Sequence, residues 1–386
     1  MRARDAPTRR VGVPLPLLPC SPVAQGAAPD YLDRDAALTP RTARRSGRPV
    51  AHAPIDLTPM LQIQRVVHPT DFSDGARAAF AHALHLARQH GATLDVLHAA
   101  PQLGTKDISM AFYPEGFEAQ YRAEQEAAVD AYVREAETEG VTLTVAPCVY
   151  GGPVALEILN YAHAIDADLI VMGSHGRRGI KRLVLGSVAE MVIQRAACPV
   201  LTVQARPDGT DRPDHVRCIV VAVDFPYFAE ELVRYADALA KLYGSAVVLL
   251  HVINDVNGVT DAEVARSGLE PPDRWLADVE ADALHRLEHL RLHLIDPATA
   301  VSYHVSSGYT LDRVPAAIEQ IAPDLVVTAT HGFKGIDRMV MGSITDQILR
   351  RGHRATFVVK PTGTSLLEPL DADGPLARSV ALSRSV

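Results

Sequence analysis

The chain carries two copies of one pattern, in which short apolar runs alternate with amphipathic segments. Its clearest marker is the run Gly173-Ser174-His175-Gly176, which is followed after nine residues by Gly186-Ser187. An altered form of this run returns 156 residues later, so that His331 is the equivalent of His175. Short runs rich in β-branched residues, as at 169–171, suit strands that are covered on both faces. Such alternation predicts parallel sheets with right-handed crossovers.

We place the first repeat at residues 61–205 and the second at 214–361. In the first repeat the predicted strands are 65–69, 93–99, 141–149, 169–172 and 200–203, and the predicted helices are 74–90, 115–139, 153–165 and 187–196. In the second repeat the predicted strands are 218–223, 246–252, 300–305, 325–328 and 355–359, and the predicted helices are 227–243, 262–294 with a break at Pro271-Pro272, 310–321 and 343–351. The predicted fold class is α/β, with two tandem doubly wound, Rossmann-like domains, each a five-stranded parallel sheet flanked by helices.

The segments outside the repeats lack a periodic apolar pattern. Residues 1–60 are rich in Pro, Ala, Arg and Asp and are predicted to be a disordered extension, and residues 362–386 a flexible tail. No apolar run approaches the roughly 20 residues that a bilayer-spanning helix needs. Prolines interrupt the apolar stretch near the start, where a signal peptide would have its helical core. We therefore expect a cytoplasmic protein that does not associate with membranes.

The charge and the cysteines exclude some classes of protein. A formal net charge of −8 over 386 residues implies no domain-wide basic surface, which argues against nucleic acid as the main partner. The four cysteines show neither CxxC nor zinc-ligand spacing and fit a reducing compartment. We predict that Cys148 and Cys198 are buried packing residues.

Three histidines, His285, His289 and His293, have a four-residue spacing that could bind a metal on a helix. No carboxylate or cysteine clearly completes such a site. We therefore predict no metal, and we expect these histidines on the exposed side of a helix that turns Leu284, Leu287 and Leu294 toward the core.

A candidate binding site follows from the fold class. In open parallel sheets, ligands bind beyond the carboxyl ends of the strands, near the point where strand order reverses. Three segments of the first repeat should meet there, namely Pro69-Thr70-Asp71, Met172 through Gly176, and Gly186-Ser187. Glycines would let backbone N–H groups approach a ligand, and the start of a helix at Ser187 would add donors and a positive dipole. The spacing favours an anion such as a phosphate chain, with one such place in each repeat.

Each of these segments also has a structural interpretation. Asp71 could accept hydrogen bonds from an adenine amino group or ribose hydroxyls, or it could cap the next helix. Gly173 and Gly176 could be plain turn glycines, and Ser187 is also an ordinary N-cap residue. The chain has no GxxxxGK[ST], no GxGxxG after a strand and no GxSxG elbow. These absences argue against P-loop NTPases, nicotinamide enzymes and α/β-hydrolases.

Together, four segments resemble the universal stress protein family over nearly all of each repeat. They are Pro69-Thr70-Asp71-Phe72-Ser73, Val171-Met172-Gly173-Ser174-His175-Gly176-Arg177-Arg178-Gly179, Leu185-Gly186-Ser187-Val188-Ala189-Glu190, and Cys198-Pro199-Val200. The ATP-binding branch of that family is marked by G-x2-G-x9-G-[ST], which the first repeat matches in full. The resemblance implies ATP as the ligand, and Mg²⁺ is expected with the triphosphate.

The resemblance also implies which residues bind. Asp71 and Ala99 would lie near adenine and ribose. The phosphates would be surrounded by Gly173, His175, Gly176, Gly186 and Ser187, and the same predicted site includes Pro69, Thr70, Met172 and Val188.

The second repeat departs from the motif. Ala329 stands at the first glycine position, and Pro226 stands where the first repeat has Ser73. If the first position needs φ > 0 or close phosphate contact, a Cβ there costs on the order of 1 kcal/mol or more. We therefore expect the nucleotide mainly in the first repeat, with a weaker second site made of Asp224, Val252, Gly332, Gly342 and Ser343.

The resemblance implies a stress-response regulator that binds ATP and, without a poised base or nucleophile, hydrolyses it slowly at most. The two halves are expected to pair about a pseudo-twofold axis, with a homodimer and an unknown regulatory protein as further partners. Two alternatives stay open. One is an interaction module of the same fold whose glycines serve only turn geometry, and the other is an adenylate-transferring or hydrolysing enzyme, for which the sequence offers no identifiable substrate pocket.

Overall fold

The computed structural model describes residues 61–100, 117–137, 140–146, 149–150, 152–174, 185–206, 208–225, 228–254, 272–330, 342–351, 354–361 and 363–367. All of them belong to one compact unit. The predicted extension at 1–60 lies outside the described residues, as do Cys148, His175, Gly176 and Gly332.

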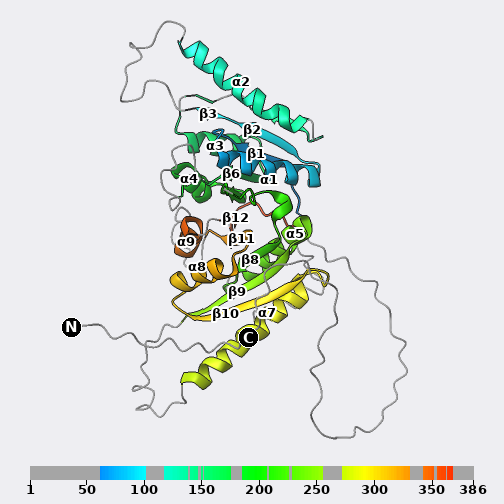
Figure 1. Ribbon diagram of the computed structural model, residues 1–386, viewed down its shortest axis with the longest axis vertical. Helices are drawn as coiled ribbons and strands as arrows, with labels where there is room; N and C mark the ends of the chain where they lie inside the picture. The colour runs from blue at the N-terminus through cyan, green and yellow to red at the C-terminus, as the bar shows by residue number, and fades with distance from the viewer. Residues whose placement is uncertain are drawn as a thin grey trace, which may run out of the picture. The chain divides into compact units, whose positions relative to one another are not determined.

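Ten strands form one continuous sheet in the described part of the chain (Figure 1). The order is β10-β9-β8-β11-β12-β7-β6-β1-β2-β4, so each repeat contributes five neighbouring strands. The strands of the first repeat are β1 (Arg65–Pro69), β2 (Thr93–Leu97), β4 (Leu143–Val145), β6 (Leu169–Gly173) and β7 (Val200–Val203). Those of the second are β8 (Cys218–Ala222), β9 (Ala246–Asn254), β10 (Val301–Gly308), β11 (Leu325–Ala329) and β12 (Ala355–Val359). This confirms the predicted fold class.

The two halves of the sheet meet at β7 and β12, which pair antiparallel, whereas all other neighbours pair parallel. Leu201 lies opposite Phe357, and Val200 and Thr202 lie opposite Val358 and Thr356. Leu201 and Phe357 are equivalent residues, because the repeats are offset here by 156 positions. A local twofold axis therefore passes between these two residues.

Two strands that the sequence predicts as continuous are divided. Residues 93–99 form β2 and then, after His98, the short β3 (Ala99–Ala100). Residues 141–149 form β4 and the start of β5 (Val149–Tyr150), and β3 pairs with β5 in a separate two-stranded sheet. The strand thus changes partner at His98, which places Ala99 beside the end of the main sheet rather than within it.

The helices cover both faces of the sheet. One face carries α1 (Asp74–His90), α2 (Phe117–Glu137), α5 (Ala229–Tyr243) and α7 (Pro272–Leu294). The other carries α3 (Val154–Ala164), α4 (Ser187–Arg195), α8 (Thr310–Ile321) and α9 (Ser343–Arg351). A short 3₁₀ turn, η2 (Pro213–His215), lies between the repeats. Gly91 ends α1 with φ 61° and donates its N–H to the Ala87 carbonyl, which is the geometry of a left-handed C-cap glycine.

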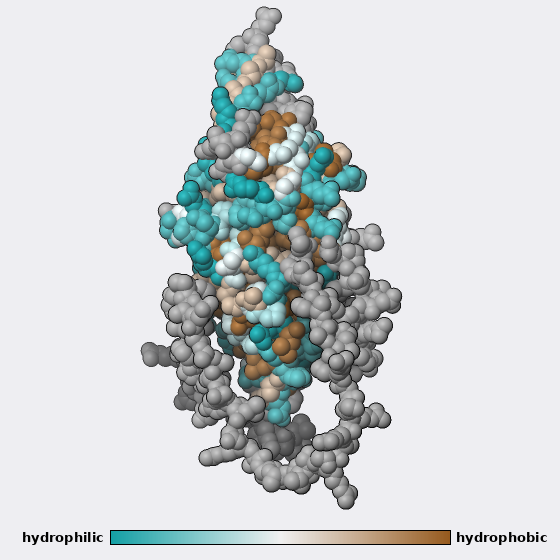
Figure 2. Space-filling model, turned by 90° about the vertical axis from the view of Figure 1, so that its right-hand side faces the viewer, coloured by the Kyte–Doolittle hydropathy of each residue, from teal (hydrophilic) through white to brown (hydrophobic). Residues whose placement is uncertain are grey.

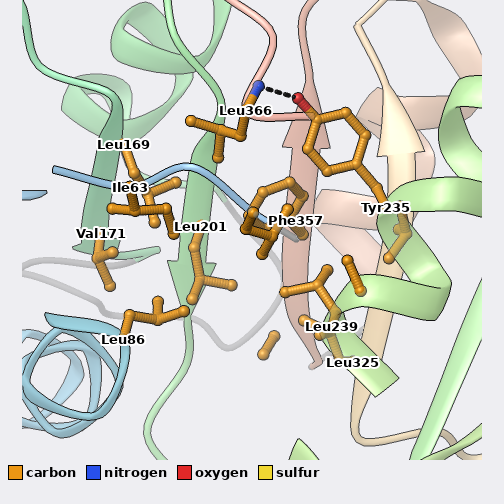
Figure 3. Close-up of a cluster of buried hydrophobic side chains, with 14 of the residues drawn as sticks. Ile63, Leu86, Leu169, Val171, Leu201, Tyr235, Leu239, Leu325, Phe357 and Leu366 are labelled. Atoms are coloured by element: carbon orange, nitrogen blue, oxygen red, sulfur yellow. Dashed lines mark hydrogen bonds between the residues drawn. The ribbon is translucent and has the colours of Figure 1, made fainter. Parts of the chain in front are cut away.

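The core on the α1 side of the sheet is shared by both repeats. It contains Leu86 and Leu201 from the first repeat and Tyr235, Leu239 and Phe357 from the second (Figure 3). A single apolar layer thus crosses the β7–β12 junction on this face, so that the two tandem domains predicted from the sequence share part of their core. Because both halves bury side chains in the same layer, each half depends on the other for its stability.

Residues 363–367 add to this core. Leu366 and Leu367 are buried, and the N–H of Leu366 donates to the Tyr235 hydroxyl at 2.7 Å (Figure 3). Leu367 also forms a bridge with Leu61 at the beginning of the first repeat. The sequence analysis assigned both leucines to the flexible tail. Their burial differs from that prediction, because these two apolar side chains pack between the two halves.

A buried histidine joins the repeats on the same face. His82 in α1 contacts the Tyr243 hydroxyl at the end of α5 through Nδ1 and the Asp211 carbonyl through Nε2, both at 3.1 Å. A carbonyl only accepts, so Nε2 carries the hydrogen and Nδ1 accepts from Tyr243. Burial lowers the pKa of His82 to about 4. The neutral ring therefore satisfies both partners, and a second proton would disturb them.

On the opposite face, α4 and α9 are linked by Arg350. Its Nη2 lies 3.1 Å from Glu190 of α4, and its Nε lies 2.7 Å from Asp346 of its own helix. Glu190 and Asp346 are equivalent residues, whereas the equivalent of Arg350 is Gln194. The junction is therefore symmetric in its backbone but not in its charges.

Each repeat uses an aspartate to hold the start of its first strand. Asp168 Oδ2 accepts hydrogen bonds from the backbone N–H groups of Gln64 and Arg65 at 2.8 and 2.9 Å. Asp324 does the same for residues 217–218 at 2.9 and 3.1 Å. The aspartate that precedes the fourth strand of each repeat thus fixes the neighbouring first strand.

We expect Asp168→Ala to lower the free energy of unfolding by about 2 kcal/mol, because two N–H groups lose a charged acceptor. Asp168→Asn keeps one acceptor oxygen and should lose less. Urea unfolding followed by circular dichroism measures both values. An alanine variant as stable as the parent protein would contradict this role.

Polar and apolar residues both reach the surface on the face that Figure 2 presents. Large exposed apolar side chains in the described ranges include Leu284 and Leu292 of α7. Leu287 and Leu294 are buried as predicted, but Leu284 is 43% exposed, because Ala283 takes the core-facing position on that turn. Across the described residues, no helix combines the length and apolar character needed to span a bilayer.

Candidate functional site

The first-repeat segments that the sequence singles out converge at the carboxyl ends of β1, β2 and β6. The N–H of Gly186 donates to the Ser174 carbonyl at 2.9 Å, and the N–H of Ser174 donates to the Val203 carbonyl at 2.8 Å. These bonds bring the start of α4 back to the end of β6. The segment 175–184 between them, with His175 and Gly176, lies outside the described residues.

The helix α4 begins at a glycine. Gly186 is its N-cap residue, in an extended conformation, and as a glycine it supplies no side-chain cap. Ser187 is exposed and Val188 is partly buried against the core. The first N–H groups of α4 are therefore not capped by the side chain of their own N-cap residue, and the positive dipole end of the helix is suited to an anion.

The loop after β1 is held by its own side chains. The N–H of Thr70 donates to the Leu97 carbonyl at 2.9 Å, and Thr70 Oγ1 accepts from the N–H of Phe72 at 3.0 Å. Asp71 Oδ1 accepts from the N–H of Ser73 at 3.1 Å. Phe72 takes a positive φ of 62°, which turns the chain sharply toward α1. Asp71 stays partly exposed at the end of β1.

The structure resolves the alternative role of Asp71. The residue that caps α1 is Ser73, whose Oγ accepts from the N–H of Ala76 at 3.2 Å. The interpretation of Asp71 as the helix cap is therefore wrong, because the cap lies two residues further along the chain. Asp71 braces the turn before the cap instead.

A histidine that the sequence analysis missed lies in the same place. His98 directly precedes Ala99, is buried, and its Nδ1 lies 2.8 Å from the Thr70 carbonyl. Its ring packs on Phe72 with a centroid distance of 4.7 Å. The carbonyl accepts the Nδ1 hydrogen, so His98 connects the end of β2 to the Asp71 loop. The signal in the sequence was its recurrence at His251 in the second repeat.

Gly173 is needed for packing in this structure. A Cβ at Gly173 would lie 2.8 Å from the backbone carbon of Gly75 and 2.9 Å from the backbone nitrogen of Ala76. The backbone of Gly173 is that of the β-strand, not the left-handed region. The possibility that this position needs φ > 0 is therefore wrong, and the close approach that is seen is to the start of α1.

The second repeat accommodates Ala329 by a later helix start. The helix α5 begins at Ala229, the equivalent of Ala76, whereas α1 begins two residues before Ala76. Phe228 precedes α5 with φ 58° and gives it no side-chain cap. The change from glycine to alanine thus coincides with a change in the facing helix, and it no longer argues by itself for a weaker second site.

Other predicted residues are placed as follows. Met172 is 5% exposed and lies in the core with Val67 and Ile170, so that its side chain faces away from solvent. Pro69 is also buried, whereas Ala99 is partly exposed. Of the described binding residues predicted in the first repeat, those that keep some exposure are Asp71, Ala99, Gly173, Gly186, Ser187 and Val188.

The second repeat brings together the segments that are equivalent to those of the first-repeat site. The N–H of Gly342 donates to the Thr330 carbonyl at 2.6 Å, and Ser343 begins α9. Asp224 is exposed after β8, and Val252 is buried within β9.

An arginine distinguishes the candidate site of the second repeat from that of the first. His251 Nδ1 lies 2.9 Å from the Val223 carbonyl, and its ring packs on Phe225 with centroids 4.4 Å apart. The guanidinium of Arg286 lies 4.1 Å from the Phe225 centroid. Burial lowers the pKa of His251, although the nearby Asp224 partly opposes this.

His68 takes part in a buried hydrogen-bond network next to the candidate site of the first repeat. Its Nδ1 lies 2.8 Å from the Val171 carbonyl and its Nε2 lies 3.1 Å from the Tyr132 hydroxyl. Burial lowers the pKa of His68 to about 4, so the ring is neutral at pH 7. The equivalent residue is Val221, which shows that the network is not a feature of both repeats. It ties α2 to the sheet.

The described residues contain no group of three or more His, Cys, Asp or Glu side chains arranged to hold a metal ion. Cys198 is buried, as predicted, and burial raises the pKa of its thiol to about 11. Cys218 is likewise buried. A thiol with a raised pKa is a poor nucleophile, which fits a packing role for Cys198.

Comparison with known proteins gives a consistent result. The profile of the universal stress protein family matches residues 62–204 and 215–360. A universal stress protein of Methanocaldococcus jannaschii is 35% identical over 150 residues, which cover 36% of this chain and 82% of that protein. One of Bacillus subtilis is 34% identical over 139 residues, which cover 35% of this chain and 94% of that protein.

A solved structure supports the fold. The crystal structure of a universal stress protein from Archaeoglobus fulgidus superposes with a TM-score of 0.53 at 22% identity. The superposition covers 78% of this chain and 97% of the other. At this level of identity the likeness concerns the fold alone.

Proposed function

The chain belongs to the universal stress protein family, and on that premise we propose that it binds ATP in its first repeat and acts as a nucleotide-responsive regulator in the stress response. The observation that carries the proposal is the open start of α4, which the bond between Gly186 and Ser174 holds at the carboxyl end of β6. Phosphates would occupy this helix start, with the Ser187 hydroxyl as a further donor.

The Asp71 loop supports the nucleoside end of the proposed site. Asp71 is partly exposed, and its carboxylate could accept hydrogen bonds from ribose hydroxyls or the adenine amino group. Ala99, beside the end of β2, would then face the base. His98 fixes the distance between these two segments through its bond to the Thr70 carbonyl. Mg²⁺ would accompany the triphosphate, bound chiefly by phosphate oxygens and water.

We propose a regulatory role rather than an enzymatic one. At the nucleoside end of the site, Asp71 braces its own turn, and His98 is buried and bound to a carbonyl. Neither is placed as a base for an attacking water. Any ATP hydrolysis should therefore be slow, and fast phosphate release that Ser187→Ala abolishes would contradict this.

We expect Asp71→Asn to weaken ATP binding by about 10-fold or more, because a neutral amide replaces the charged acceptor of the nucleoside. The matched control is Asp224→Asn, which changes the equivalent loop of the second repeat and should leave the main binding event unaltered. Isothermal titration of the full chain with Mg–ATP measures both. Equal effects of the two substitutions would show that the repeats bind alike.

Nucleotide that stays bound during purification gives an independent test. Fresh protein is denatured, and the released nucleotide is quantified per chain by chromatography. About one ATP per chain, lost in Asp71→Asn but not in Asp224→Asn, is the result expected from one dominant site. A bulky substitution at Gly173 is unsuitable here, because it would collide with the backbone of Gly75.

One observation favours a second candidate, a protein-interaction module of the same fold that binds no nucleotide. Gly173, the first glycine of the motif, is explained by its contact with Gly75 and Ala76 without any ligand. This candidate predicts no nucleotide in the purified protein and no thermal shift with Mg–ATP. The homodimer, the regulatory partner and the cytoplasmic location stay predictions from the sequence.

A further inference from the structure

The exposed side of α7 carries a pair of stacked histidines. His289 and His293 lie four residues apart, with ring centroids 4.0 Å from each other and planes 25° apart. His289 is exposed and His293 is partly exposed, so both rings are accessible to an ion from solution. Their Cα atoms belong to the last turns of α7, before the buried Leu294 and Ile295. The buried residues that follow the pair hold this end of α7 against the core, while the two rings face the solvent.

One hydrogen bond defines the hydrogen position on His293. Its Nδ1 lies 2.7 Å from the His289 backbone carbonyl. Since a carbonyl can only accept, Nδ1 carries the hydrogen, and in the neutral ring the lone pair is on Nε2. This is the arrangement of a metal-binding histidine whose second nitrogen is held by a protein carbonyl.

The surroundings of His289 keep it available as well. Partial burial, followed by the neighbouring His293 and His285, lowers the pKa of His289. This shift favours the unprotonated ring, which has a lone pair on one nitrogen. On the helix packed beside it, Glu230 of α5 lies close enough to act electrostatically on His289 in the opposite sense. A negative charge at that position would also favour a bound dication.

We propose that His289 and His293 form a surface chelate for a divalent transition cation of the Zn²⁺ or Cu²⁺ class. Imidazole nitrogens four residues apart on one helical face are a recurrent pair of ligands for these ions. No third ligand completes the group among the described residues, so water fills the remaining positions. The lack of a completing carboxylate or cysteine led to the sequence prediction of no metal, and the exposure of both rings together with the carbonyl bond of His293 changes that conclusion.

A cation bound here would join the last two turns of α7. These turns lead directly to Leu294 and Ile295 and then to β10 at the edge of the sheet. The site is separate from the carboxyl ends of β1 and β6, so the proposal does not depend on nucleotide binding.

Calorimetric titration of the full chain with ZnCl₂ at pH 7.4, in a buffer that does not chelate metals, tests the proposal. We expect one equivalent of Zn²⁺ to bind, and His289→Ala and His293→Ala each to weaken that event by about tenfold or more, because a single imidazole replaces a two-point chelate. His163→Ala removes an exposed histidine of α3 and should leave it unchanged, and so should His285→Ala.

Several outcomes would overturn the assignment. They are equal zinc binding by the parent protein and the His289→Ala variant, an equal loss in His163→Ala, or a loss in His285→Ala as large as that in His289→Ala. Far-ultraviolet circular dichroism of the metal-free variants shows whether α7 is intact, so that a loss of binding is not mistaken for unfolding.

Discussion

Replacing Phe357 with alanine is expected to lower the free energy of unfolding by about 3–5 kcal/mol and to weaken both repeats together. Phe357 is fully buried, lies opposite Leu201 on the local twofold axis, and packs on Tyr235 with centroids 5.6 Å apart. Its removal leaves a cavity at the point where the two halves share their core. The loss should therefore spread to β7 and β6 of the first repeat as well as to β11.

Hydrogen exchange distinguishes this effect from an ordinary core defect. The matched control is Phe80→Ala, which empties a buried position in α1 that packs on His68 and Tyr132 of its own repeat. We expect Phe80→Ala to reduce protection in the first repeat more than in the second. Phe357→Leu, which keeps more volume, provides a milder variant if the alanine protein does not fold. Loss of protection confined to the second repeat in Phe357→Leu would contradict a shared core.

Acidification from pH 6.5 to pH 4 is expected to destabilise the protein by roughly 3 kcal/mol for each of His68 and His82. Both rings are buried and neutral, with pKa values lowered to about 4 from an ordinary value of 6.5. Between these values the unfolded chain binds more protons than the folded one, so that stability falls as the pH falls. This contribution fades as the pH rises past 6.5, because the unfolded chain then also loses its protons from these rings.

Substitution of His82 tests its share of this slope. His82→Gln keeps an acceptor and a donor for the Tyr243 hydroxyl and the Asp211 carbonyl but cannot be protonated. Urea midpoints measured between pH 4 and pH 7.5 should show a smaller slope in this variant than in the parent protein. His163→Gln, at an exposed position of α3, is the control and should leave the slope unaltered. An unchanged slope in His82→Gln would rule out His82 as a source of the acid sensitivity.

The sequence predicts the local elements well because their ends carry chemical signals. The helix α1 has Ser73 before it and Gly91 after it, and both residues act as caps in the structure. Strands β1, β7 and β12 have the predicted bounds, and each of them contains a short run of β-branched or other apolar residues. The strand that divides at His98 has no such signal, since an apolar run does not indicate where a strand changes partner.

The arrangement between the repeats was harder to predict. Edge-to-edge pairing of β7 with β12 depends on two strands that each look like an ordinary buried strand. The burial of Leu366 also depends on a hydroxyl that lies 131 residues away, on Tyr235. Contacts of this kind arise from packing between distant segments, which the periodicity of a single sequence does not report.

At the candidate site, the sequence predicts the meeting of the Asp71 loop with the start of α4, because parallel strands end at one edge of a sheet. It does not predict the reason for Gly173, which depends on a backbone that lies 98 positions earlier, at Gly75. It also did not single out His98, whose role becomes visible only when its contact with Thr70 is known. The ligand itself stays a prediction.

The local twofold axis between Leu201 and Phe357 has a consequence for how such a chain can diverge. In an assembly of two identical subunits, one mutation alters both halves at once, so a change that harms either role is rejected. Here the two halves are inherited together, but each can mutate independently of the other. For example, the equivalent of Arg350 is Gln194, and the equivalent of His68 is Val221. One half can keep an ancestral role while the other acquires a different one, and the common sheet keeps the two as partners.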